Sequence, residues 1–133
     1  MIEETSDYFV ERDGVRYAGV HLIIDLWGGE RLDDLAYVEA TILNCVEAAG
    51  ATELHRFFHH FAPNGVTGFI ALEESHISIH TWPEDGYAAV DIFMCGNAEP
   101  HKAVEVLREA FPTGRLKVKE LLRGPVSTGR SPR

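Results

Sequence analysis

Several side chains in the middle of this sequence are of types that bind metals or take part in catalysis, and their spacing limits what they could do together. Five of the seven histidines lie in this region: His55, His59, His60, His76 and His80. On a strand, residues four apart share one face but lie about 13 Å from each other, at roughly 3.3 Å per residue. Metal-binding nitrogens lie about 2 Å from the ion. A metal site would have to be assembled across strands, and packing and hydrogen bonding on a sheet are the simpler expectation for His55, His59 and His76.

A serine nucleophile is a second possibility. Ser75, His80 and Asp91 could be drawn as a Ser-His-acid triad, but Ser75 lies in no G-x-S-x-G motif of the kind that exposes a catalytic serine. The sequence also contains no G-x-G-x-x-G, G-x-x-x-x-G-K or H-E-x-x-H motif. Triad hydrolases, nucleotide-binding proteins and zinc hydrolases are therefore disfavoured.

Residues 65–96 contain three motifs that occur together in one known family. The stretch reads GVTGFIALEESHISIHTWPEDGYAAVDIFMCG. Within it, Glu74-Ser75-His76 stands between two strand-like runs and is followed by His80-Thr81-Trp82-Pro83-Glu84 and by Cys95-Gly96. These motifs, in this order, resemble those of the bacterial S-adenosylmethionine decarboxylase family. The resemblance extends from about residue 16 to residue 124.

The resemblance implies that the chain cuts itself between Glu74 and Ser75. Decarboxylation of an amino acid leaves a carbanion, which needs an electron sink that no side chain supplies. In this family the serine hydroxyl attacks the preceding carbonyl, and β-elimination and hydrolysis then turn the serine into a pyruvoyl group. For a single domain of residues 1–133, the implied products are a β chain, residues 1–74, and an α chain, residues 75–133, that begins with the pyruvoyl group made from Ser75. Neither a metal nor pyridoxal phosphate is implied.

The resemblance also implies roles for three side chains beyond the cleavage point. His80 corresponds to the histidine that removes the α-proton during elimination, a role that an imidazole can fill as a base at neutral pH. Cys95 corresponds to the cysteine that returns a proton to the decarboxylated carbon. Thr67 stands where the family more often has a serine that assists processing, and threonine keeps the hydroxyl but adds a methyl group. Cys45, in contrast, lies on the apolar stripe of a predicted helix and is expected to be a buried packing residue.

Three further residues are implied in substrate binding. Phe61 and Trp82 resemble aromatic residues that line the family site, where a flat base such as adenine could stack; ordinary core packing is the alternative. Glu84 resembles the carboxylate that binds the ribose hydroxyls, and a turn carboxylate that faces water is the alternative. In the family the site lies between two sheets: one protomer provides the residues that correspond to Ser75 and Cys95, and its neighbour provides Phe61, Thr67, His80 and Glu84. The resemblance therefore implies a homodimer.

The first expectation for the reaction is decarboxylation of S-adenosylmethionine, which makes the aminopropyl donor for spermidine synthesis. Some relatives decarboxylate arginine or ornithine instead, and the acidic residues Glu73, Glu84 and Asp85 could hold the second cationic group of such a substrate. A third hypothesis is an unprocessed paralogue that binds or regulates a catalytic partner, although the intact motif residues argue against it.

The pattern of apolar residues predicts the elements that must position these motifs. Strands are predicted at residues 16–27, 52–61, 66–72, 76–82, 87–94 and 115–122, and helices at residues 32–49 and 98–111. Short connections between the central strands favour a largely antiparallel sheet with both helices on one face, a two-layer α/β (α+β) sandwich. Two helices cannot cover Phe57, Phe58, Phe61 and Trp82 together, which favours two sheets packed face to face in a dimer. Residues 1–15 are expected to be loosely held and residues 124–133 to be disordered.

The composition is consistent with this interpretation. The 133 residues carry a net charge of −9, which disfavours nucleic acid and anionic membranes as partners. The acidic charge suits a cationic small molecule as a partner, and solubility alone is the alternative explanation. No apolar run approaches the roughly 20 residues that cross a bilayer, and no charged leader precedes an apolar segment. The two cysteines form no C-x-x-C pair and are expected to be reduced. A cytoplasmic protein is therefore expected.

Overall fold

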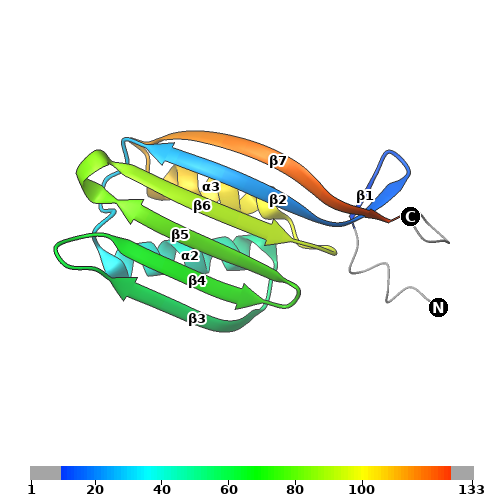
Figure 1. Cartoon of the computed structure of the whole chain (residues 1–133), viewed down its shortest axis with the longest axis horizontal. Helices are drawn as coiled ribbons and strands as arrows, with labels where there is room; N and C mark the ends of the chain where they lie inside the picture. Colours follow the sequence, from blue (N-terminus) through cyan, green and yellow to red (C-terminus); the bar gives the residue numbers. More distant parts are fainter. Residues whose placement is uncertain (1–9, 127–133) are drawn as a thin grey trace.

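The alternating apolar segments form one seven-stranded sheet in the computed structural model, which describes residues 10–126 (Figure 1). The strands are β1 (Val10–Arg12), β2 (Val15–Trp27), β3 (Glu53–His60), β4 (Val66–Leu72), β5 (Ser75–Trp82), β6 (Tyr87–Met94) and β7 (Arg115–Val126). The helices are α2 (Leu35–Ala49) and α3 (Pro100–Ala110), and a short 3-10 turn, η1 (Pro83–Asp85), follows β5. The strand order is β3-β4-β5-β6-β2-β7, with β1 paired to the start of β2, and all of these pairings are antiparallel.

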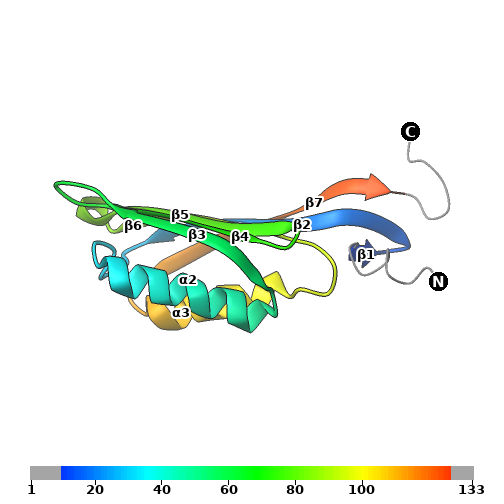
Figure 2. The same cartoon turned by 90° about the horizontal axis from the view of Figure 1, so that it is seen from below.

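Both helices pack on the same face of the sheet, so the molecule has two layers (Figure 2). The side chains of β2 that face the helices are fully buried: Val20, Leu22, Ile24 and Leu26. Ile42 of α2 and Leu107 of α3 are buried in the same core. The predicted two-layer sandwich with two helices on one face of a largely antiparallel sheet is confirmed.

Local capping sets the length of α2. The side chain of Asp34 accepts a hydrogen bond from the backbone N–H of Tyr37, so the helix begins at Leu35, three residues after the predicted start. Gly50 ends it with a φ of +75°, in the left-handed region that glycine adopts readily. The predicted stop at this glycine is confirmed.

The sheet extends further than predicted at both ends of the chain. The short strand β1 falls in the segment expected to be loosely held, and β7 continues past residue 122, with Arg16 opposite Val126. Because residues 124–126 belong to β7, the expectation of a disordered end starting at residue 124 is wrong for these three residues. Residues 127–133 lie outside the described part of the chain. Figure 2 shows the paired ends of β2 and β7 extending beyond the helix layer.

The sheet face opposite the helices carries exposed aromatic side chains. Phe57, Phe61 and Trp82 are exposed by 58%, 46% and 43%, whereas Phe58 points to the other face and packs against the core. The expectation that two helices cannot cover all four side chains is therefore correct. Neither helix within residues 10–126 is long and apolar enough to span a membrane.

Candidate active site

The segment expected to be cut forms the tight turn between β4 and β5. Leu72 pairs with Ser75, which leaves Glu73 and Glu74 as the turn residues. Glu74 has a φ of +57°, in the left-handed region, where a residue with a Cβ atom is disfavoured by about 1–2 kcal/mol. The peptide bond that joins Glu74 to Ser75 therefore follows a strained residue.

Cys95 contacts this turn because β5 and β6 run antiparallel. Ser75 begins β5 and Cys95 follows the last residue of β6, so the two lie at the same end of the sheet. The thiol of Cys95 donates a hydrogen bond to the carbonyl oxygen of Glu74, with 2.9 Å between sulfur and oxygen. The Cys95 sulfur is 3.8 Å from Oγ of Ser75.

The thiol of Cys95 is kept in its protonated form. Partial burial raises the pKa of Cys95, the hydrogen bond with Ser75 opposes this shift, and the nearby charge of Glu74 adds to it. A thiol with a raised pKa is neutral at pH 7 and can act as a hydrogen-bond donor. The turn thus combines a hydroxyl, the preceding carbonyl and a donor at the carbonyl oxygen, which are the parts needed for an acyl shift.

A second group of predicted residues lies at the other end of β5. Thr67 and His80 are paired across β4 and β5, with 3.0 Å between Oγ1 of Thr67 and Nδ1 of His80. Phe61, Trp82 and Glu84 line the same surface pocket, which has a volume of about 390 Å³. The structure therefore brings together all five residues expected to assist processing or bind substrate.

The two groups do not meet within one chain. Ser75 and His80 are five residues apart on β5, which places them about 17 Å apart at roughly 3.3 Å per residue. Glu74, Ser75 and Cys95 form the group at one end of the sheet, which we call the cleavage end. Five residues form the group at the other end, which we call the pocket end: Phe61, Thr67, His80, Trp82 and Glu84.

The acidic residues considered for a second cationic group of the substrate are also divided. Glu73 lines a pocket of about 240 Å³ beside Ser75 and Cys95. Glu84 and Asp85 lie in η1, at the pocket end. The three carboxylates therefore form no cluster within one chain.

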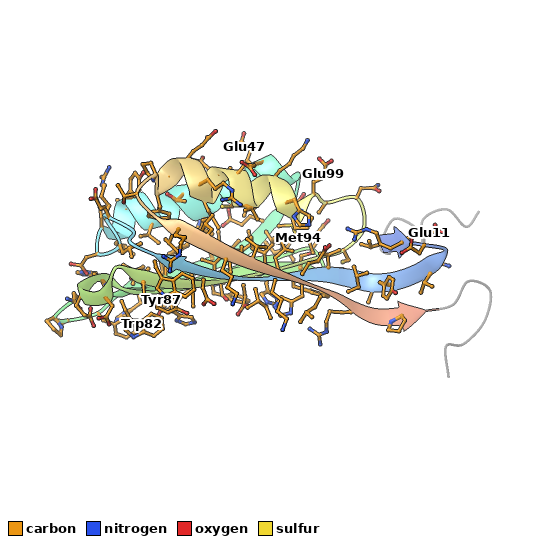
Figure 3. The ribbon with its side chains drawn as sticks, turned by 90° about the horizontal axis from the view of Figure 1, so that it is seen from above. Glu11, Glu47, Trp82, Tyr87, Met94 and Glu99 are labelled. Carbon is orange, nitrogen blue, oxygen red and sulfur yellow. The ribbon has the colours of Figure 1, made fainter. Side chains whose placement is uncertain are left out.

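Tyr87 lies beside Trp82, a contact that the sequence did not predict. The ring of Tyr87 lies 5.3 Å from that of Trp82, and its hydroxyl donates a hydrogen bond to Asp25 at 2.5 Å, which raises the pKa of Tyr87. Figure 3 shows Trp82 and Tyr87 on the side of the sheet away from the helices. Alternation along residues 87–94 places Tyr87 on this face, but only the pairing of β5 with β6 brings it to Trp82.

The remaining cysteine and histidines have other surroundings. Cys45 is fully buried in α2, its thiol donates to the carbonyl of Ala103 at 3.5 Å, and burial raises its pKa to about 12. This confirms its predicted packing role.

His76 stacks on Phe69 with 5.6 Å between ring centres, and burial lowers the pKa of its imidazole. Among residues 10–126, no three His, Cys, Asp or Glu side chains form a group that could hold a metal ion.

The chain is similar to known proteins in both sequence and structure. The sequence model described as S-adenosylmethionine decarboxylase matches residues 20–124. An S-adenosylmethionine decarboxylase proenzyme from Methanococcus vannielii is 44% identical over 115 residues, covering 84% of this chain and 94% of that protein. A protein of the same name from Thermomicrobium roseum is 46% identical over 110 residues, covering 81% and 95%. The crystal structure of the adenosylmethionine decarboxylase from Aquifex aeolicus superposes with a TM-score of 0.75 at 30% identity, covering 86% of this chain and 97% of that one.

Proposed function

The chain belongs to the S-adenosylmethionine decarboxylase family, and we propose that it is a self-processing enzyme that decarboxylates S-adenosylmethionine with a pyruvoyl group made from Ser75. The observation that carries the proposal is the hydrogen bond from Cys95 to the carbonyl oxygen of Glu74. It places a donor on the carbonyl that the Ser75 hydroxyl must attack. The product would serve as the aminopropyl donor for spermidine synthesis.

The proposed cleavage begins when Oγ of Ser75 attacks the carbonyl carbon of Glu74. Negative charge develops on the carbonyl oxygen, where the thiol of Cys95 stabilises it by hydrogen bonding. The C–N bond between Glu74 and Ser75 breaks and the nitrogen takes up the proton that Oγ has lost, which leaves an ester through Oγ and a free amine at Ser75. The strained φ of Glu74 raises the energy of the intact peptide and so favours this step.

The second stage removes the upstream chain. Loss of the α-proton of Ser75 expels the carboxylate of Glu74 by β-elimination and leaves dehydroalanine at position 75. Addition of water and loss of ammonia then produce the pyruvoyl group. The products are a β chain of residues 1–74 and an α chain of residues 75–133.

The base for the elimination comes from a second copy of the chain. His80 of the same chain is about 17 Å from Ser75, too far for proton transfer. Two copies packed through their exposed sheet faces, in opposite senses, would place the partner's pocket end, with His80, against the end of the sheet that carries Ser75, and so would complete both sites. The exposed Phe57, Phe61 and Trp82 support this homodimer because it would cover them.

Thr67 orients the ring of His80 for this role. If Nδ1–H of His80 donates to Oγ1 of Thr67, Nε2 carries the free lone pair that can accept the α-proton. The threonine hydroxyl is thus sufficient, and the added methyl group does not prevent the contact.

The same two groups of residues act in the decarboxylation. The pyruvoyl carbonyl supplies the electron sink that the amino-acid substrate needs. Cys95 returns a proton to the carbon that has lost CO2, a role suited to a thiol that is protonated at neutral pH. Phe61 and Trp82 stack against the adenine ring, and the carboxylate of Glu84 accepts hydrogen bonds from the ribose hydroxyls.

Intact mass and CO2 release test the proposal together. The purified protein should separate into chains of 74 and 59 residues, as the cut after Glu74 requires. It should release CO2 from S-adenosylmethionine and not from arginine or ornithine. Ser75→Ala should remain one chain, whereas Ser78→Ala, on the same strand, should be cut normally. A wild-type chain that stays whole, or that releases CO2 only from a diamino acid, would contradict the proposal.

A further inference from the structure

We propose that Asp33 is a positioning residue for the substrate pocket and acts through the turn that carries Phe61. The inference rests on the function proposed above, because that proposal gives Phe61 its role in binding. Asp33 lies in the loop between β2 and α2, and its side chain is not part of the pocket lining.

One carboxylate oxygen of Asp33 holds both ends of this turn. Oδ1 accepts a hydrogen bond from the backbone N–H of Gly65 at 2.8 Å and lies 2.8 Å from Nε2 of His60. His60 is the last residue of β3, and Gly65 directly precedes β4. Phe61 follows His60, and its backbone N–H donates to the carbonyl of Gly65 at 2.8 Å. The position of Phe61 therefore depends on two residues that both contact Asp33.

The loop that carries Asp33 is itself attached to the central strands. The buried hydroxyl of Thr81 donates to the carbonyl of Leu32 and accepts from the backbone N–H of Val66, both at 2.8 Å. Leu32 directly precedes Asp33, and Val66 directly follows Gly65. These hydrogen bonds attach the loop that carries Asp33 to β4 and β5, the strands that form the pocket.

A charged anchor is needed because packing restrains Phe61 only partly. Its side chain is 46% exposed and has an edge contact with His59, with 4.5 Å between ring centres. Hydrogen bonds to a carboxylate are stronger than those between neutral groups. The amide of Gly65, followed by His60, lowers the pKa of Asp33, so its carboxylate is charged at neutral pH.

The loop offers a matched control in the next residue. Asp34 carries the same charge, but its carboxylate caps α2 through the backbone N–H of Tyr37 and pairs with Arg31. Asparagine is also a good N-cap, so Asp34→Asn removes an equal charge without loss of the helix start. General effects of charge in this loop appear in both variants, and an effect on the turn appears only at Asp33.

The test measures CO2 release from S-adenosylmethionine by the processed protein, per mole of pyruvoyl group. Asp33→Ala should raise KM about tenfold and leave kcat within about twofold, because the turn that positions Phe61 loses two hydrogen bonds while Thr67, His80 and Cys95 keep theirs. Asp33→Asn, which keeps an acceptor but no charge, should give an intermediate KM, and Asp34→Asn should match the wild type. In a Phe61→Ala background, Asp33→Ala should cause no further rise in KM. Hydrogen exchange of the Gly65 amide should accelerate in Asp33→Ala and not in Asp34→Asn.

The results that would overturn the role of Asp33 differ from the result that would refute the proposed function. A fall in kcat with unchanged KM, or effects of Asp33→Ala and Phe61→Ala that multiply in the double variant, would overturn the inference. Unchanged exchange at Gly65 would overturn it as well, whatever the activity. A wild-type enzyme that releases no CO2 from S-adenosylmethionine would instead refute the proposed function, and the exchange measurement would still decide whether Asp33 holds the turn.

Discussion

The thiol of Cys95 lies 2.9 Å from the carbonyl oxygen of Glu74, although the two residues are 21 positions apart in the chain. The contact exists before any bond is cut, so the proton donor proposed for decarboxylation is already at the bond that must break. Under the proposed function, one thiol acts twice: it stabilises the oxyanion during cleavage and later returns a proton to the substrate carbon.

Removal of this thiol should slow the cleavage itself. We expect Cys95→Ala to reduce the rate of self-cleavage about 10- to 100-fold, because the developing negative charge on the Glu74 carbonyl loses its donor. Cys95→Ser keeps a donor and should be slowed less. The rate is measured by intact mass at intervals after synthesis. Cys45→Ala is the control, and a Cys95→Ala chain that is cut as fast as this control would exclude the oxyanion role.

Relief of the strain at Glu74 should stabilise the uncut chain and slow its cleavage. Glycine adopts a positive φ without the Cβ penalty, so Glu74→Gly in the uncleavable Ser75→Ala background should raise the free energy of unfolding by about 0.5–1 kcal/mol. With Ser75 intact, the same change should lower the cleavage rate. Glu74→Gln keeps the Cβ atom and serves as control in denaturant unfolding. Equal stability of the glycine and glutamine variants would show that the turn stores no useful strain.

A site shared between two copies predicts complementation between inactive chains. Ser75→Ala and His80→Ala should each be inactive alone. When they are co-expressed, a mixed dimer contains one site with both residues intact, and random pairing should restore about a quarter of wild-type cleavage and activity. Ser75→Ala with Cys95→Ala should not complement, because both residues belong to the cleavage end. Recovery in neither mixture would place His80 and Ser75 in the same protomer's site.

The hydroxyl of Thr67 should matter more than its methyl group. Thr67→Val keeps the shape but removes the partner of His80 Nδ1, and we expect about tenfold slower cleavage because the ring loses its orientation. Thr67→Ser keeps the hydroxyl and should be cut at least as fast as the wild type. The measurement is again the fraction of intact chain over time. Equal rates for valine and serine would mean that the 3.0 Å contact has no role in processing.

The raised pKa of Cys95 predicts how its reactivity depends on pH. A raised pKa means less thiolate at a given pH, so iodoacetamide should modify Cys95 of the uncut Ser75→Ala chain slowly at pH 7. Its rate should still be rising above pH 8.5, where a free cysteine is half ionised. Cys45, with a pKa of about 12, should not react while the chain is folded. Peptide mass mapping identifies the modified residue, and fast reaction of Cys95 at pH 7 would contradict a protonated donor.

The sequence by itself determined the order of the motifs, the type of most elements and the stop of α2 at Gly50. These features depend on signals within a few residues of each other: apolar residues that alternate along a strand, an apolar stripe along a helix, and the glycine that ends α2. Short or weakly patterned segments were predicted less well. Strand β1 has three residues, and the continuation of β7 to Val126 depends on its partner β2 more than on its own composition.

Only the tertiary structure decided which motif residues meet. The antiparallel pairing of β5 with β6 brings Cys95 to Ser75, while five residues along β5 carry His80 away to the pocket end. The hydrogen bond from the Gly65 amide to Asp33 depends in the same way on tertiary packing. It forms only because the loop before α2 packs against the turn between β3 and β4. Strand register and loop docking result from packing between segments far apart in sequence, which local patterns do not specify.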